Sequence, residues 1–130
     1  MKLLWLLLLL NQPAFIAKPL VRKTGKVYIG SVKDARGNSI YHVVSHFYTM
    51  QAARVLHGYN HVLFFNKKWQ VIADYDVSMP EHLPVLLKNN TLYFRQQDDG
   101  RRAVLHRQVI NPATAPPAWL CVGVDGCYSK

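Results

Sequence analysis

The sequence predicts a mainly β protein, built as an antiparallel meander of about six to seven strands with one short helix at Thr49–His57. Short segments rich in β-branched and aromatic residues, in which apolar and polar residues alternate, recur along the chain. Turn residues such as Gly, Asn, Asp and Pro separate these segments. The same pattern allows one alternative, an α+β fold in which the helix packs on one face of the sheet.

Residues 1–17 have the layout of a secretory signal peptide. A basic second residue precedes the unbroken apolar run Leu3–Leu10, and the polar segment Asn11–Pro13 follows it. The run is far shorter than the ~20 residues that span a bilayer. We expect cleavage after Ala17 and a secreted protein, or one of the periplasm or cell envelope. Because Phe15 occupies a position where the peptidase prefers a small residue, an uncleaved segment is the alternative, and it is the only membrane attachment expected.

Residues 18–25 are basic and include a proline, so we expect an exposed arm that leads into a single β-rich domain over residues 26–130. The first strand is predicted over Lys26–Val32, which alternates and is rich in β-branched and aromatic residues. Asp34–Asn38 supplies the turn residues, and Ile40–Tyr48 is expected to return as the second strand.

The helix at Thr49–His57 is predicted from residue preferences. Thr49 is a suitable N-cap, the alanine, methionine, leucine and arginine residues that follow favour helix, and Gly58 is a common terminator. A helix this short depends on packing for its stability.

The rest of the domain is predicted as a series of hairpins. Asn89 with Asn90, and Asp98–Gly100, supply turn residues between strands. Three prolines make the segment 111–118 extended before the chain returns at Trp119. The expected strands are His61–Phe65, Trp69–Val77, Pro84–Leu87, Thr91–Arg95 and Arg101–Ile110.

Cys121 and Cys127 are the two cysteines of the chain and define a C-terminal loop, 121–127. In an oxidising compartment an isolated pair forms a disulfide, and closing so short a loop contributes roughly 2 kcal/mol in the chain-entropy model. A structural zinc site needs two close pairs of ligands, and a redox-active pair is normally separated by two residues. We therefore predict a structural disulfide.

Positive charge dominates the composition, with sixteen Lys and Arg residues against seven Asp and Glu and a net charge of +9. A cationic surface attracts anionic polymers, although charge scattered along the chain also serves solubility alone. Cations interleaved with aromatic rings are typical of β surfaces that bind such polymers. The candidate binding residues are Lys67, Lys68, Trp69, Tyr93, Arg95, Arg101 and Arg102.

Catalytic motifs are absent from the sequence. The pairs His42 with His46 and His57 with His61 are spaced four apart, but neither has the adjacent glutamate of a metalloprotease. No glycine-rich phosphate loop or nucleophile elbow occurs. We therefore expect no catalytic set, no metal site and no cofactor.

Asp74 and Asp76 are the nearest approach to a catalytic carboxylate pair, because alternate strand residues can meet the ~5–9 Å separation of glycosidase carboxylates. The expected function is nevertheless that of an exported, non-enzymatic binding module, whose partner is a protein or an anionic glycan or lipid surface. The sequence has no strong nucleic-acid signal. A structural subunit with paired sheet edges, or a small hydrolase that uses these two aspartates, are the alternatives.

Overall fold

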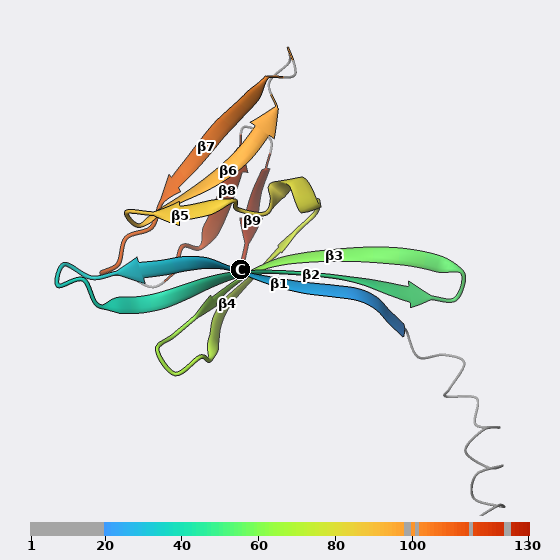
Figure 1. The fold of residues 1–130 in the computed structure, drawn as a ribbon, viewed down its shortest axis with the longest axis horizontal. Helices are drawn as coiled ribbons and strands as arrows, with labels where there is room; N and C mark the ends of the chain where they lie inside the picture. Colours follow the sequence, from blue (N-terminus) through green and yellow to red (C-terminus); the bar gives the residue numbers. More distant parts are fainter. Residues whose placement is uncertain (1–19, 98–99, 101, 115, 124–125) are drawn as a thin grey trace, which may run out of the picture.

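The computed structural model describes residues 20–97, 100, 102–114, 116–123 and 126–130. The expected signal peptide, 1–17, lies outside the described residues. Within the described part, no helix is long and apolar enough to cross a membrane. The protein is mainly β, as predicted, and its strands form antiparallel sheets (Figure 1).

Nine strands and one short 3-10 helix, η1, are described, in three sheets with the orders β1-β2-β3-β4, β5-β6-β7 and β8-β9. Each sheet is a meander, because every hydrogen-bonded neighbour is also the next strand along the chain. The bounds are β1 Leu20–Lys33, β2 Ser39–Ala52, β3 Val55–Phe65, β4 Val71–Val77, η1 Pro80–His82, β5 Leu86–Lys88, β6 Thr91–Gln97, β7 Ala103–Val109, β8 Trp119–Gly123 and β9 Gly126–Ser129.

The prediction of a helix at Thr49–His57 is wrong. β2 continues to Ala52, Ala53 and Arg54 form the turn, and β3 begins at Val55. Gln51 and Ala52 pair with β3, and Gln51 also pairs with Leu20 of β1, so strand partners satisfy this backbone from both sides. An isolated helix of this length is marginal in water, and its modest residue preferences do not outweigh a continuous strand ladder.

The first strand also differs from expectation. β1 begins at Leu20, so most of the arm expected over residues 18–25 belongs to the sheet. The far ends of β1, β2 and β3 project as a ribbon away from the rest of the molecule (Figure 1). We call this part, residues 20–24, 48–52 and 55–59, the distal ribbon, and its tip is the turn at Ala53 and Arg54 together with the adjoining Val55 and Leu56.

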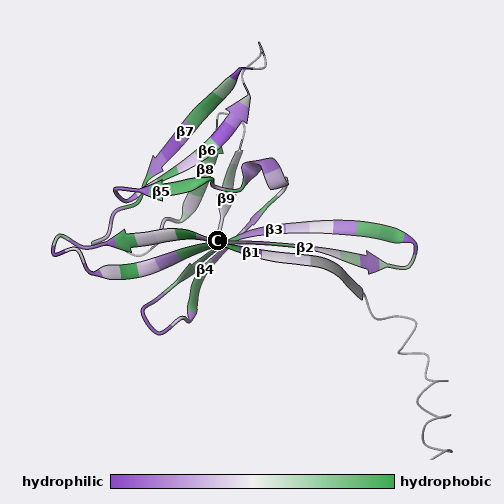
Figure 2. Ribbon diagram, viewed as in Figure 1, coloured by the Kyte–Doolittle hydropathy of each residue, from purple (hydrophilic) through white to green (hydrophobic). Residues whose placement is uncertain are grey.

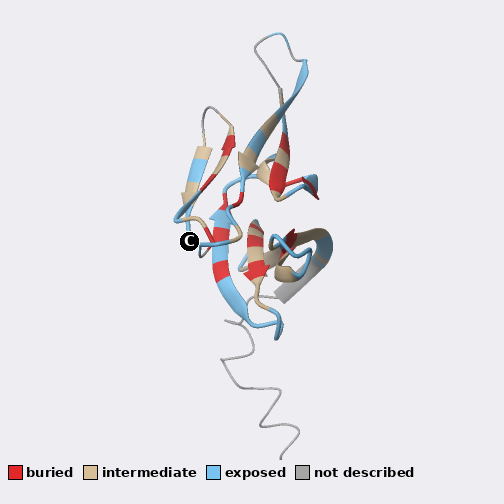
Figure 3. Ribbon diagram, turned by 90° about the vertical axis from the view of Figure 1, so that its left-hand side faces the viewer, coloured by how far each residue is buried: buried red, intermediate tan, exposed pale blue. Residues whose placement is uncertain are grey.

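One face of the four-stranded sheet packs against the other two sheets, and the core lies between them (Figure 3). In β4 the buried residues Ala73, Tyr75 and Val77 alternate with exposed ones, so one face of this strand belongs to the core. Tyr75 is fully buried there, its hydroxyl donates to the Pro117 carbonyl, and burial raises its pKa to about 12. The largest fully buried side chains are Tyr75, Phe64, Phe94, Leu92, Ile110, Leu120, Val32, Val43, Val62, Val77 and Val122.

Side-chain amides join sheets that share no strand pairing. Asn90, in the β5–β6 turn, accepts from the Lys33 N–H and donates to the Lys33 carbonyl, both at 2.8 Å. Asn89 and Asn90 have φ of 51° and 56°, which confirms the predicted turn.

Gly30 lies where an added Cβ would be 3.1 Å from Leu87 Cβ, so this glycine permits the close approach of β1 to β5.

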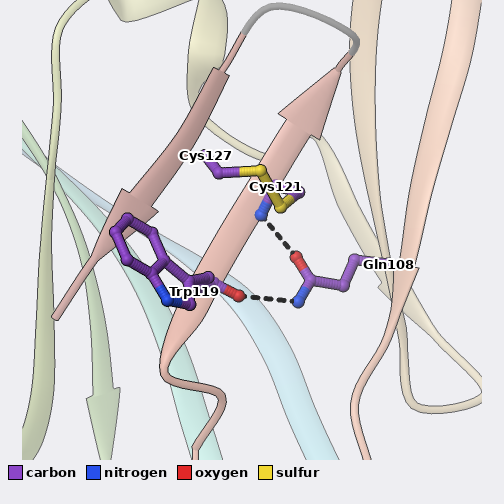
Figure 4. Close-up of a disulfide and its surroundings, with 4 residues drawn as sticks. All are labelled: Gln108, Trp119, Cys121 and Cys127. Carbon is purple, nitrogen blue, oxygen red and sulfur yellow. Dashed lines mark hydrogen bonds between the residues drawn. A yellow bond between two sulfur atoms is a disulfide. The ribbon is translucent and has the colours of Figure 1, made fainter.

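The predicted disulfide between Cys121 and Cys127 is confirmed. The two cysteines are cross-strand partners in the β8–β9 hairpin, so the segment expected as a loop is largely strand. Gln108 of β7 holds this hairpin: its Nε2 donates to the Trp119 carbonyl at 3.0 Å, and its Oε1 accepts from the Cys121 N–H at 2.7 Å (Figure 4).

Candidate functional site

Two of the predicted binding residues, Tyr93 and Arg95, lie together on the outer face of the β5–β6–β7 sheet. Leu92 and Phe94 are fully buried, and because strand residues alternate between faces, their neighbours Tyr93 and Arg95 point away from the core. Arg95 is exposed and Tyr93 is partly buried. The alternation of β6 therefore positions both side chains.

The strand register adds two cations that the sequence pattern does not single out. Tyr93 pairs with Arg107 on one side and with Leu86 on the other, and Lys88 pairs with Thr91. Arg107 and Lys88 are both exposed. Directly opposite residues place their Cβ atoms about 4.5–5.5 Å apart, and diagonal neighbours such as Arg95 and Arg107 are about 7–8 Å apart. The Asp-Gly turn signal before β7 implied this hairpin, but not its register.

We call Leu86, Lys88, Tyr93, Arg95, Leu105, Arg107 and Val109 the cationic face. Its charges are of one sign, since the described strands β5, β6 and β7 contain no Asp or Glu. Its apolar members are exposed: Leu105 retains 61% of its accessible surface and Val109 71%. The face thus combines cations, one aromatic ring and uncovered aliphatic side chains.

A hollow of about 590 Å³ adjoins the cationic face at Arg95. η1 forms its other wall, where Glu81 supplies a carboxylate. His82 is held by a 2.6 Å hydrogen bond between its Nδ1 and the Tyr128 hydroxyl. The residues that line the hollow are Pro80, Glu81, His82, Leu83, Val85, Arg95 and Gln96.

The other predicted binding residues do not join this face. Lys67, Lys68 and Trp69 lie in the β3–β4 turn of the four-stranded sheet. Arg102 is exposed just before β7, and Arg101 lies outside the described residues. The predicted binding residues therefore lie on two separate surfaces, because closeness of cations and aromatic residues in the sequence does not show which sheet they belong to.

Trp69 is part of a different cluster. Its φ of 59° is unusual for a bulky residue, and it brings the indole over the outer face of the four-stranded sheet. There the ring stacks on His42, with centroids 4.2 Å apart, and lies near Tyr28 and Phe65. Although 55% of Trp69 is exposed, its ring is already engaged within the protein.

His46, His61 and Asp74 meet farther along that outer face. His61 Nδ1 is 2.7 Å from Asp74 Oδ1, and His46 is the cross-strand partner of His61. Burial lowers the pKa of His46, with further lowering by Lys26 and His61, while Asp74 opposes the shift. An orienting aspartate on a histidine is also a feature of catalytic sites.

The His61 ring in this arrangement is closed to a substrate. Its other ring nitrogen, Nε2, is buried and has no hydrogen-bond partner among the described residues. One carboxylate oxygen of Asp74 contacts His61, and the Asp74 side chain is 52% exposed. In the described part of the chain, no group of three His, Cys, Asp or Glu side chains is placed to hold a metal ion.

No protein-family model matches the chain, and no curated protein or solved structure is detectably similar to it.

Proposed function

We propose that this protein is an exported, non-enzymatic binding module that holds an anionic glycan on its cationic face. The observation that carries the proposal is the grouping of three exposed cations, Lys88, Arg95 and Arg107, around Tyr93 on strands without an acidic residue. The Cys121–Cys127 disulfide and the signal-like start support an oxidising, external location, where an anionic glycan is an accessible partner.

The geometry suits an extended polymer. Diagonal spacing of about 7–8 Å between Arg95 and Arg107 lets two guanidinium groups contact successive anionic groups. Arginine binds planar anions through two parallel hydrogen bonds. Tyr93, between these cations, supplies an aromatic surface for a sugar ring, and the adjoining hollow extends the contact area beyond Arg95.

Chromatography on immobilised heparin tests the proposal. The double variant Arg95→Gln/Arg107→Gln removes two charges from the cationic face, and Lys67→Gln/Lys68→Gln removes two charges from the β3–β4 turn as a matched control. We expect the first variant to bind heparin roughly three- to thirtyfold more weakly and the control to bind as the unaltered protein does. Circular dichroism confirms that both variants are folded.

Three results would overturn the glycan assignment. Equal weakening of both variants would mean that net charge alone holds the polymer. Elution of the unaltered protein below physiological ionic strength would remove the polymer and favour a protein partner, whose contact would survive that salt. Tighter binding to a single-stranded oligonucleotide of the same charge would identify a nucleic-acid ligand instead.

A further inference from the structure

The tip of the distal ribbon carries exposed apolar side chains that lie outside the described core. Val55 and Leu56 retain 54% and 61% of their accessible surface. The buried core contains no described residue between Ser45 and Asn60, so these side chains do not support the fold. The end of β3 at the tip is coloured hydrophobic in Figure 2. Large exposed apolar side chains on a projecting element are typical of an interaction site.

The N-terminal part of the chain enters the structure beside the same tip. Leu20 is the cross-strand partner of Gln51, two residues before the turn at Ala53. The described chain therefore begins beside the apolar tip, and the apolar run Leu3–Leu10 precedes it in the sequence.

Positive charge accompanies these apolar residues. Lys18, Arg22 and Lys23 precede or begin β1, and Arg54 lies in the turn itself. No acidic residue occurs from Met1 to Lys33 or from Phe47 to Asn60. Apolar side chains flanked by cations are the combination that binds anionic membrane surfaces, with the apolar groups in the interface and the cations at lipid phosphates.

We propose that the tip of the distal ribbon is a membrane-contact element for an anionic lipid surface. An anionic lipid surface suits the tip whether the N-terminal segment is kept or is cleaved after Ala17. If the apolar run is kept, it supplies a second apolar segment for the same bilayer, ahead of the point where the described chain begins beside Gln51. If it is removed after Ala17, the new amino group adds a positive charge beside Lys18 at the same end. The lipid-contacting surface is separate from the cationic face, so this inference does not depend on the glycan proposal.

Flotation with phosphatidylcholine vesicles that contain one third phosphatidylglycerol tests the lipid contact, with the protein isolated from its producing cells. The variant Val55→Ser/Leu56→Ser removes the apolar tip. The matched control Val71→Ser/Ile72→Ser alters two exposed aliphatic residues at the start of β4. We expect the tip variant to bind at least tenfold more weakly, Arg54→Gln about fivefold more weakly, and the control to bind unchanged.

A second readout does not depend on whether the N-terminal segment is kept. Brominated lipid quenches tryptophan fluorescence only on contact, so we expect Leu56→Trp to add a quenched component and Ile72→Trp to add none. Equal quenching of the two variants, or none in either, would overturn the proposal. Loss of vesicle binding in Arg95→Gln/Arg107→Gln would assign the lipid to the cationic face instead. If the unaltered protein is a dimer and Val55→Ser/Leu56→Ser is a monomer, the tip is a contact between copies of the chain and not a lipid-binding element.

Discussion

His46 shows how a strand position sets the charge of a side chain. It faces Lys26 of β1, Tyr48 of its own strand, His61 of β3 and, through His61, Asp74 and Asp76 of β4. Thr24 is its hydrogen-bond neighbour at 3.4 Å. Burial and the two nearby basic groups disfavour the protonated ring, whereas Asp74 favours it. The lowered pKa makes the outer face of this sheet sensitive to acid.

The pKa of His46 predicts that the protein loses stability as the pH falls. A histidine has a pKa of about 6.5 when unfolded, and the folded value is lower, so the unfolded chain binds the proton first. This contribution is complete above about pH 6.5 and is lost as the pH falls from that value through the folded pKa. Thermal unfolding between pH 8 and pH 5 measures it.

His46→Gln should flatten the dependence of the melting temperature on pH over that interval. The exposed His57 lies on the neighbouring strand β3, and His57→Gln serves as the control, which should keep the full dependence. A variant at His46 with the same pH dependence as the unaltered protein would contradict the assignment of the acid sensitivity to this residue.

Asn90 combines an unusual backbone conformation with a link between two sheets. Asn90→Gly keeps the turn and removes the two hydrogen bonds to Lys33, so we expect the free energy of unfolding to fall by about 1–2 kcal/mol. Asn90→Ala also puts at a φ of 56° a residue that has a Cβ but not the local hydrogen bonds that let Asn adopt this conformation, so it should lose about 1–2 kcal/mol more than Asn90→Gly. Urea denaturation ranks the two variants, and equal losses would show that the turn conformation is not strained.

The side chain of Gln108 in β7 hydrogen-bonds the backbone of the β8–β9 hairpin, with which β7 has no strand pairing. Its amide presents one donor and one acceptor, as a peptide group would, and bonds the backbone of Trp119 and Cys121 (Figure 4). The disulfide closes the hairpin on itself, but only tertiary contacts hold the hairpin to the rest of the core. The side chain of Gln108 is therefore part of the connection between two elements.

Replacement of Gln108 tests that connection. Gln108→Met keeps the length of the side chain and removes both hydrogen bonds, so we expect a loss of about 1–3 kcal/mol in urea denaturation. Gln108→Glu keeps an acceptor for the Cys121 N–H but sets a carboxylate oxygen against the Trp119 carbonyl. Its stability should rise as the pH is lowered and the carboxylate is protonated. Unchanged stability of Gln108→Met would show that packing alone holds the hairpin.

Among the described strands, β1 is the longest that lies at a sheet edge, which bears on whether copies of the whole molecule assemble through it. β1 is the terminal strand of its sheet, but its register shifts between Val21 and Lys23, between Tyr28 and Gly30, and between Val32 and Lys33. Such irregularities twist an edge and interrupt the row of donors and acceptors that a neighbouring strand needs. The edge is thus poorly suited to continuous pairing.

We accordingly expect the sedimentation coefficient to be independent of protein concentration in the micromolar range. Analytical ultracentrifugation measures this directly, at high and low salt. An increase in size with concentration that Val27→Pro abolishes, while the control Val71→Ser does not, would instead support a structural subunit that assembles through the β1 edge.

Much of the β architecture was predictable because its signals are local. Alternating apolar residues, turn residues such as Asn89 and Asn90, and the spacing of Cys121 and Cys127 act between near neighbours in the chain. These signals predicted a mainly β protein, most of the strands and the disulfide. They also placed Tyr93 and Arg95 on one predicted strand, Thr91–Arg95.

The tertiary structure decided which residues from distant parts of the chain meet. Arg107 and Lys88 lie beside Tyr93 because of the strand register. Lys67 and Lys68 lie far from the other predicted binding residues in the fold, because their turn belongs to another sheet. The segment Thr49–His57 became strand for the same reason. Its residues weakly favour helix, but backbone pairing with β1 and β3 is a non-local interaction that no local preference encodes.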